Sequence, residues 1–298
     1  MTLTEGYLTT TDGIRVFFQK AGTGPDAVIV PNAAYMFDDF KHLAEHRTVI
    51  FYDLRNRGRS DAITDASKLK GGVDNDVADL EAVRAYFDLA RVSLLAHSYV
   101  GFVVALYAMR YPEHVNRVVQ IGPSQPLPGK QYPPHLQGAD AVSAEANAKM
   151  MELQKEGPAG DPEEFGKKMW ALMKPLYVAN PEDAHKITWS VDHLPNESLI
   201  RLLTYFTQYL SPSIQTTNLT PQDFAKAGMP VLTIHGARDR HAPYGGGRDW
   251  ASFLPDARLV TVEGGAHLPW IESPEKVFGS IDVFLDGRWP ETAERLQP

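Results

Sequence analysis

Short apolar runs alternate with longer segments of mixed polarity along this chain, and their order predicts an α/β fold. The apolar runs are bounded by glycine, proline and charged residues, which is typical of strands buried on both faces of a sheet. We expect such strands at 27–30, 48–52, 93–95 and 115–121, with a helix from about 74 to 87. The segments 6–9 and 14–20 flank Asp12-Gly13 and predict a β-hairpin.

The pattern changes after Ile121. Residues 122–129 and the run Tyr132-Pro133-Pro134 are rich in proline and glycine, which is typical of a linker that crosses the molecule. From about 143 to 210 the chain reads as helices rich in methionine and aromatic residues. We therefore expect three parts: the first part of an α/β core at 1–124, a helical cap at 125–220, and the second part of the core at 221–298.

Ser98 lies between an apolar run that starts at Val92 and a helical pattern that continues past Gly101. A serine in a sharp strand-to-helix turn exposes its hydroxyl above the sheet and aims the N–H of the next residue, Tyr99, at the group that it attacks. The usual pattern is Gly-x-Ser-x-Gly, whereas this chain has Ala96 and Val100 at the glycine positions. A helix-capping serine is the alternative reading.

Two further residues that could assist a serine nucleophile also follow predicted strands. Asp239 comes just after the apolar run 229–236, and His267 follows the apolar run 257–262 in a glycine-rich loop. Loops at the carboxyl ends of parallel strands share one edge of a sheet, so Ser98, Asp239 and His267 can meet there. A serine needs a histidine as base, and the histidine needs a carboxylate to orient it.

Other residues compete for these roles. His97 and His241 are closer in sequence to Ser98 and Asp239, but neighbouring side chains on a strand or turn point apart. Asp249 and Asp256 are rival acids, and we place them in or beside a helix that follows a loop at Gly245-Gly246-Gly247.

With these motifs in order, the chain resembles the α/β-hydrolase superfamily over nearly its whole length. Residues 51–61 are similar to the strand and turn that precede the family's nucleophile, and 265–275 to its catalytic-histidine loop. Residues 248–289 are similar to proline-iminopeptidase-like members. The resemblance implies a mostly parallel central sheet flanked by helices, with a helical cap over the active-site edge.

The resemblance also implies an oxyanion hole formed by two backbone N–H groups. Tyr99 supplies one, and in the family the other follows the third strand within a His-Gly-Gly motif. Here that position holds Pro31-Asn32-Ala33-Ala34, so we expect Ala33 to be the donor, with Ala34 next in line. Replacing glycine by alanine narrows the hole but keeps the backbone donor.

Composition narrows the function classes. The net charge of −8 argues against nucleic-acid and anionic-membrane partners, so we expect a small-molecule substrate. The absence of cysteine excludes disulfides, thiolate metal sites and a cysteine nucleophile. The N-terminal residues show no signal-peptide pattern, and no apolar run approaches the ~18 residues of a membrane helix, so we expect a cytoplasmic protein. Oligomeric state is not predicted.

One motif points to different chemistry. His42-Leu43-Ala44-Glu45-His46 matches the H-x-x-E-H pattern of a group of zinc peptidases. No third ligand is evident in the sequence, and the segment fits a short helix between two strands. We expect no metal and no cofactor.

The sequence therefore predicts a serine hydrolase that cleaves a carboxylic ester or lactone of a small, largely apolar substrate through an acyl-enzyme on Ser98. A proline-iminopeptidase-like aminopeptidase is the alternative, for which Glu145, Glu152 and Glu163 could bind an ammonium group. A cofactor-free oxygenase, a C–C hydrolase and a binding protein that has lost catalysis stay open. A serine nucleophile excludes the family's aspartate-dependent epoxide hydrolases and dehalogenases.

Overall fold

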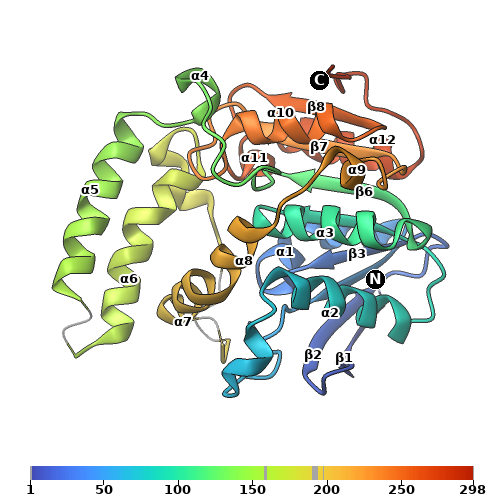
Figure 1. Cartoon of the computed structure of the whole chain (residues 1–298), viewed down its shortest axis with the longest axis horizontal. Helices are drawn as coiled ribbons and strands as arrows, with labels where there is room; N and C mark the ends of the chain where they lie inside the picture. The colour runs from blue at the N-terminus through green and yellow to red at the C-terminus, as the bar shows by residue number, and fades with distance from the viewer. Residues whose placement is uncertain (1, 158–159, 190–193, 197, 298) are drawn as a thin grey trace.

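The computed structural model describes residues 2–157, 160–189, 194–196 and 198–297. Within these residues the centre is an eight-stranded sheet in the order β1-β2-β4-β3-β5-β6-β7-β8 (Figure 1). Neighbouring strands from β4 through β3 to β8 pair in parallel, whereas β2 pairs antiparallel with both β1 and β4. The strands are β1 Leu3–Thr9, β2 Arg15–Ala21, β3 Ala27–Pro31, β4 Thr48–Tyr52, β5 Val92–His97, β6 Val115–Ile121, β7 Val231–Gly236 and β8 Ala257–Val262.

Helices cover both faces of the sheet, as the apolar strands require. One apolar cluster joins the sheet to α2, α3, α9 and α10, and a second joins the opposite face to α1, η1, α11 and α12. The bounds are α1 Ala33–Phe40, η1 Lys41–Glu45, η2 Ala66–Leu69, α2 Val73–Tyr86, α3 Tyr99–Arg110, η3 Pro112–His114, α9 Pro221–Phe224, α10 Tyr244–Phe253, α11 Pro269–Glu272 and α12 Pro274–Leu285.

A helical insertion separates β6 from β7. Figure 1 shows α5 and α6 side by side at one end of the molecule, with α7 and α8 between them and α2. The elements are α4 Pro134–Gln137, α5 Ala141–Glu156, α6 Pro162–Met173, η4 Lys174–Tyr177, η5 Pro181–Lys186, α7 Leu199–Tyr205, the π-helical turn η6 Phe206–Leu210, and α8 Ser211–Thr216. The division of the chain at 125 and 220 stays a prediction.

The insertion is fastened to the core at both of its ends. Arg240, after β7, donates to Asp140 and to the carbonyl oxygens of Val178 and Ala179. On the other side, the N–H of Val73 donates to Ser213 Oγ at 3.0 Å. Gly72 makes this approach possible, because a Cβ there would lie 2.1 Å from the same Oγ.

The predicted fold class, a mostly parallel sheet flanked by helices, is confirmed, with β1, β3 and β5 longer than expected and β2 shifted by one residue. The loop expected at the three glycines 245–247 is wrong, because these residues form the first turn of α10. They allow α10 to pack closely on the core. A Cβ on Gly247 would lie 2.2 Å from His235 Nδ1, and one on Gly245 would lie 2.2 Å from the Tyr132 ring. None of the described helices is long and apolar enough to cross a bilayer.

We expect Gly247→Ala to destabilise the protein by about 1–3 kcal/mol, because the added methyl overpacks His235. Gly279→Ala is the matched control. Gly279 lies within α12, and a methyl group added there would meet no heavy atom within 4 Å, so alanine should stabilise by about 0.5–1 kcal/mol. Urea unfolding of both variants checks this, and equal stabilities would contradict the packing argument.

Candidate active site

Ser98 occupies the turn between β5 and α3, at the carboxyl edge of the sheet. Its backbone has φ 60° and ψ −135°, a conformation that L-residues rarely adopt outside constrained turns. The turn is held by hydrogen bonds from the Ser98 N–H to Ile121 O at 2.9 Å and from the Gly101 N–H to Ser98 O at 2.9 Å. The hydroxyl is thereby presented between strand and helix, as the sequence predicts.

The residues that replace the usual glycines are accommodated by the core. Ala96 is fully buried and Val100 is 2% exposed, within the apolar cluster on the α2–α3 face. The close approach occurs one position later, at Gly101, where a Cβ would lie 3.0 Å from Pro123 Cβ. The turn therefore needs its glycine at 101, where the chain has one.

His267 links the other two predicted residues. Its Nε2 lies 3.0 Å from Ser98 Oγ, and its Nδ1 lies 2.8 Å from Asp239 Oδ2. A carboxylate can only accept hydrogen bonds, so Nδ1 carries the proton and Nε2 has the lone pair that faces the serine hydroxyl. The structure thus brings Ser98, His267 and Asp239 together from the ends of β5, β8 and β7.

The Asp239 carboxylate is fully buried and is held by four donors. The N–H groups of His241 and Ala242 donate to Oδ1 at 2.8 and 2.9 Å, and His267 and His235 approach Oδ2. Burial alone would raise the pKa of Asp239, but the interactions with His267 and His235 outweigh it and hold the pKa well below its usual range. The carboxylate is therefore ionised at all working pH values.

His235 is a part of this arrangement that the sequence reasoning missed. Its Nε2 lies 3.2 Å from Asp239 Oδ2 and 3.1 Å from Ala242 O, and both partners are acceptors. Nε2 therefore carries the proton. The signal was present in the sequence, since His235 is a polar residue within an otherwise apolar strand, four positions before the acid.

His97 and His241 both contact the His267 ring, which the sequence reasoning did not anticipate. Their ring centroids lie 4.4 and 5.1 Å from that of His267. Burial depresses the pKa of His97 well below the ordinary value and that of His241 to about 3, so both rings are neutral near pH 7. His97 Nε2 lies 2.9 Å from His267 O, and this contact helps to position the loop that carries His267.

The turn after β3 offers one of the two expected oxyanion donors. Asn32 has a left-handed conformation, φ 70°, and α1 begins at Ala33. The Ala34 N–H donates to Asp53 Oδ1 at 2.8 Å, so the second-choice donor is already engaged. The Ala33 N–H has no acceptor among the described residues. Asp53, which also accepts from Arg59, fixes this turn.

The rival groups have other partners. Asp249 accepts from Lys130 Nζ at 2.6 Å and from the Tyr132 hydroxyl at 2.7 Å. Asp256 precedes β8, at the opposite edge from His267, and its carbonyl accepts from Val231. His42 packs against Phe278, with ring centroids 4.6 Å apart. The described residues contain no group of three His, Asp or Glu side chains that could hold a metal ion.

Aromatic side chains of the insertion extend from the His267 ring. Tyr177 lies 5.4 Å from His267 and 4.1 Å from His241, centroid to centroid. Trp170 and Trp189 lie 5.6 and 5.7 Å from Tyr177, and Tyr35, after the β3 turn, lies 5.0 Å from Trp189. We call Tyr35, Trp170, Tyr177 and Trp189 the aromatic wall.

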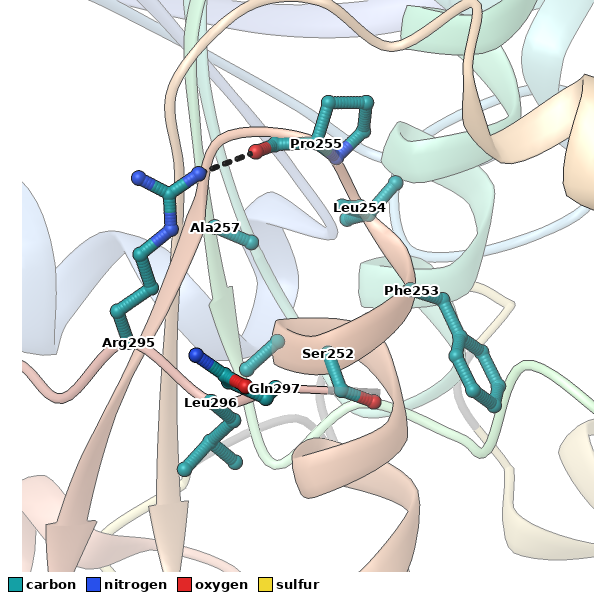
Figure 2. Close-up of a pocket in the computed structure, with 9 residues that line it drawn as sticks. Ser252, Phe253, Leu254, Pro255, Ala257, Arg295, Leu296 and Gln297 are labelled. Atoms are coloured by element: carbon teal, nitrogen blue, oxygen red, sulfur yellow. Dashed lines mark hydrogen bonds between the residues drawn. The ribbon is translucent and has the colours of Figure 1, made fainter.

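The pocket in Figure 2 is elsewhere. It has a volume of about 640 Å³ and lies between the end of α10, the start of β8 and the C-terminal segment that contains Arg295. His267 follows the other end of β8, which spans about 20 Å at ~3.3 Å per residue. Arg295 donates to Pro255 O at 3.1 Å, and no acid or histidine lines the pocket. Ser252 supplies a hydroxyl group to the lining, but the lining contains no histidine or carboxylate that could activate it.

A mostly parallel sheet that brings Ser, Asp and His together after its fifth, seventh and eighth strands is the arrangement of the α/β-hydrolase enzymes. The chain matches the family model for the alpha/beta hydrolase fold over residues 30–274 and belongs to that family.

The relatives that are named as hydrolases are of more than one kind. A proline iminopeptidase from Heyndrickxia coagulans is 27% identical over 95% of this chain and 99% of that protein. A bifunctional esterase/perhydrolase from Acinetobacter calcoaceticus is 25% identical over 88% of this chain and 92% of that protein. The solved structure of an esterase from Exiguobacterium antarcticum superposes with a TM-score of 0.70 at 17% identity, over 95% of this chain and all (100%) of that chain.

We expect Val100→Gly to lower the stability by about 2–4 kcal/mol, because it empties buried space and places glycine in the first turn of α3. The rate of ester hydrolysis should change less than about threefold, since Val100 packs into the core. Ala96→Gly is the matched control and should cost about 1 kcal/mol. A large gain in kcat/KM for Val100→Gly would show instead that Val100 obstructs the serine.

Proposed function

We propose that this hydrolase-family protein cleaves carboxylic esters or lactones of small, largely apolar substrates through an acyl-enzyme on Ser98. The observation that carries the proposal is the continuous hydrogen-bonded series from Asp239 through His267 to Ser98, with distances of 2.8 and 3.0 Å. A serine hydroxyl becomes an effective nucleophile when a neutral imidazole accepts its proton and a buried carboxylate stabilises the resulting cation.

In the proposed reaction His267 Nε2 removes the Ser98 proton as Oγ attacks the substrate carbonyl carbon. The N–H groups of Tyr99 and Ala33 donate to the oxyanion of the tetrahedral intermediate. When this intermediate collapses, the bond to the leaving alcohol breaks, and the alcohol takes the proton from His267. A water molecule, deprotonated by His267, then attacks the acyl carbon. When this second tetrahedral intermediate collapses, the bond to Ser98 Oγ breaks, His267 returns the proton to Oγ, and the acid is released.

The charges of the insertion favour an ester over an N-terminal amine. Glu145 and Glu163 are largely exposed and pair with Lys149 and Lys167 of their own helices, and Glu152 is also exposed. These carboxylates face solvent, so they do not provide the ammonium site that an aminopeptidase needs. The proline iminopeptidase that matches most of the chain keeps amide cleavage as the second candidate.

The aromatic wall favours a substrate that carries a ring. It is continuous with His267 through Tyr177 and presents the planes and edges of several rings. Aromatic pairs in such offset or edge-on arrangements contribute about 0.5–1.5 kcal/mol beyond burial. We propose that the wall packs against an aromatic or other cyclic group of the ester.

Ser98→Ala should lower kcat for p-nitrophenyl ester hydrolysis by a factor on the order of 10⁴ or more. His267→Ala should be similarly impaired, and the double variant no worse than either, because the two residues act as a unit. Ser252→Ala, in the remote pocket, is the control and should keep full activity. Prolyl-p-nitroanilide is assayed in parallel. Faster cleavage of this amide than of any ester would replace the proposal by its second candidate.

Trp170→Leu and Trp189→Leu should each lower the preference for aryl over matched cyclohexyl esters by about two- to tenfold, the range expected for one lost aromatic pair. The measured quantity is the ratio of kcat/KM for each ester pair, with the ring on either the acyl or the alcohol side. Trp289→Leu, whose ring packs on Phe284 away from the wall, is the control. An unchanged ratio in both wall variants would remove the wall from substrate recognition.

A further inference from the structure

A group of buried polar side chains near the turn that carries Ser98 has no hydrogen-bond partner among the residues that the structure describes. Asp76 is 1% exposed, and neither of its carboxyl oxygens has a partner among the described residues. The hydroxyl groups of Tyr52, fully buried, and of Tyr205, 2% exposed, are also buried without a partner within that part of the chain. Tyr52 and Tyr205 belong to the same buried cluster as Val73 and Val77, which flank Asp76 in the sequence of α2. Burial raises the pKa of both tyrosines, followed by Asp79 and then Asp76 for Tyr52 and by Asp76 for Tyr205.

The three residues come from the elements that surround the nucleophile. Tyr52 ends β4 at the same sheet edge as Ser98 and pairs with Pro31, just before the Ala33 turn. Tyr99, next to Ser98, interacts electrostatically with both Tyr52 and Tyr205, and its ring lies 6.1 Å from that of Phe206. Asp76 lies in the first turn of α2, and Ser213 of the insertion approaches this helix at Gly72. The polar groups therefore lie between core and insertion, on the side of Ser98 away from His267.

Leaving these groups unpaired is costly for a folded protein. A buried polar group without a hydrogen bond costs about 1–3 kcal/mol, and apolar groups of similar shape would remove that cost. Such clusters persist where a water, an ion or a ligand completes them. Tyr205 also directly precedes the π-helical turn 206–210, and π-turns inside helices frequently mark functional sites.

We propose that Asp76, Tyr52 and Tyr205 form a polar subsite that binds a neutral carbonyl or hydroxyl group of the substrate while its ester carbonyl lies at Ser98. This inference rests on the proposed ester hydrolysis and adds a second recognition element to it. The substrate would then carry an oxygen function on its apolar body.

The charges around Asp76 favour a neutral partner over an ammonium group. Burial and the like charge of Asp79 raise the pKa of Asp76 to about 8, although Arg55 and Arg57 lower it. The carboxyl group is thus protonated near pH 7 and can donate a hydrogen bond to an oxygen acceptor. The groups that interact with it are Asp79 on α2, Arg55 and Arg57 after β4, Tyr52 on β4 and Tyr205 on α7.

The test compares p-nitrophenyl acyl esters with a series of oxoacyl esters in which a ketone is moved along the chain. For the best placed ketone we expect Asp76→Leu, Tyr52→Phe and Tyr205→Phe each to raise KM about five- to tenfold, the worth of one hydrogen bond, while KM for the plain ester is unchanged. Asp76→Asn keeps a donor and should keep the low KM. Tyr107→Phe is the control, because the Tyr107 hydroxyl is paired with Glu81 at 2.6 Å and lies outside the subsite.

The pH dependence of substrate binding distinguishes a neutral oxygen acceptor from an ammonium group as the partner of Asp76. A ketone accepts from the protonated carboxyl, so wild type should lose the ketone preference as the pH rises through about 8, whereas Asp76→Asn should not. Tighter binding above that pH of an acyl ester with a terminal alkyl amine, which stays charged to about pH 10, would mean that the subsite binds ammonium and would overturn the proposal. The melting temperature gives a readout that does not depend on substrate. Between about pH 4 and pH 8 the carboxyl group of Asp76 keeps its proton in the folded protein but loses it in the unfolded chain. The melting temperature of wild type should therefore fall relative to that of Asp76→Asn as the pH rises through this range.

Calorimetric binding of the same esters to Ser98→Ala separates this inference from the proposed reaction. If wild type hydrolyses esters but no variant distinguishes ketone from plain ester, the subsite is wrong and the reaction stands. If no ester is hydrolysed but Ser98→Ala binds the oxoacyl ester more tightly than the plain one, with the preference lost in the Ser98→Ala, Asp76→Leu double variant, the subsite stands and the proposed reaction falls.

Discussion

The arrangement around Ser98 depends on one buried charge, the carboxylate of Asp239. Removing such a group from water costs several kcal/mol unless hydrogen bonds compensate it. Here both oxygens are occupied. Oδ1 accepts from two backbone N–H groups of its own turn, and Oδ2 is approached by His267 and His235. The backbone contacts prevent the carboxylate from rotating, so the orientation of the His267 ring follows from the turn after β7.

The close packing around this pair restricts the residues beside it. A Cβ on Gly122, after β6, would lie 3.2 Å from Asp239 Oδ2 and 3.3 Å from His267 Nδ1. Gly247 gives His235 the space to reach the same carboxylate. Glycine is therefore needed at 122 and 247 because a side chain there would collide with the residues around Asp239 and His267. The turn at Ser98 tolerates Ala96 and Val100 because both face the core.

The sequence could predict those parts of the site that depend on strand order. Ser98, Asp239 and His267 each follow an apolar run, and a parallel sheet brings such positions to one edge. It could not predict which backbone amide of the β3 turn is engaged, because Ala34 is held by Asp53, which follows a different strand. For the same reason it missed the contact of His241 with His267 and the helical glycine run, since both are set by distant segments. The unpaired state of Asp76 is also a property of the packed molecule, because in sequence it is an ordinary acidic residue in the first turn of a helix.

Of two buried aspartates at the same edge of the sheet, one is thus ionised and the other neutral, because they differ in the hydrogen-bond donors around them. Asp239 receives four donors and stays ionised, so it can stabilise a cation that forms on His267 during reaction. Asp76 receives none from the described residues and is opposed by Asp79, so it keeps its proton near pH 7. When the environments of neighbouring acids push their pKa values apart, the groups take different chemical roles. The ionised carboxylate supports chemistry, whereas the protonated one is a hydrogen-bond donor available to a bound oxygen. An apolar residue at position 76 would avoid the cost of an unpaired buried carboxyl group, and this cost is the reason why we propose a binding role for Asp76.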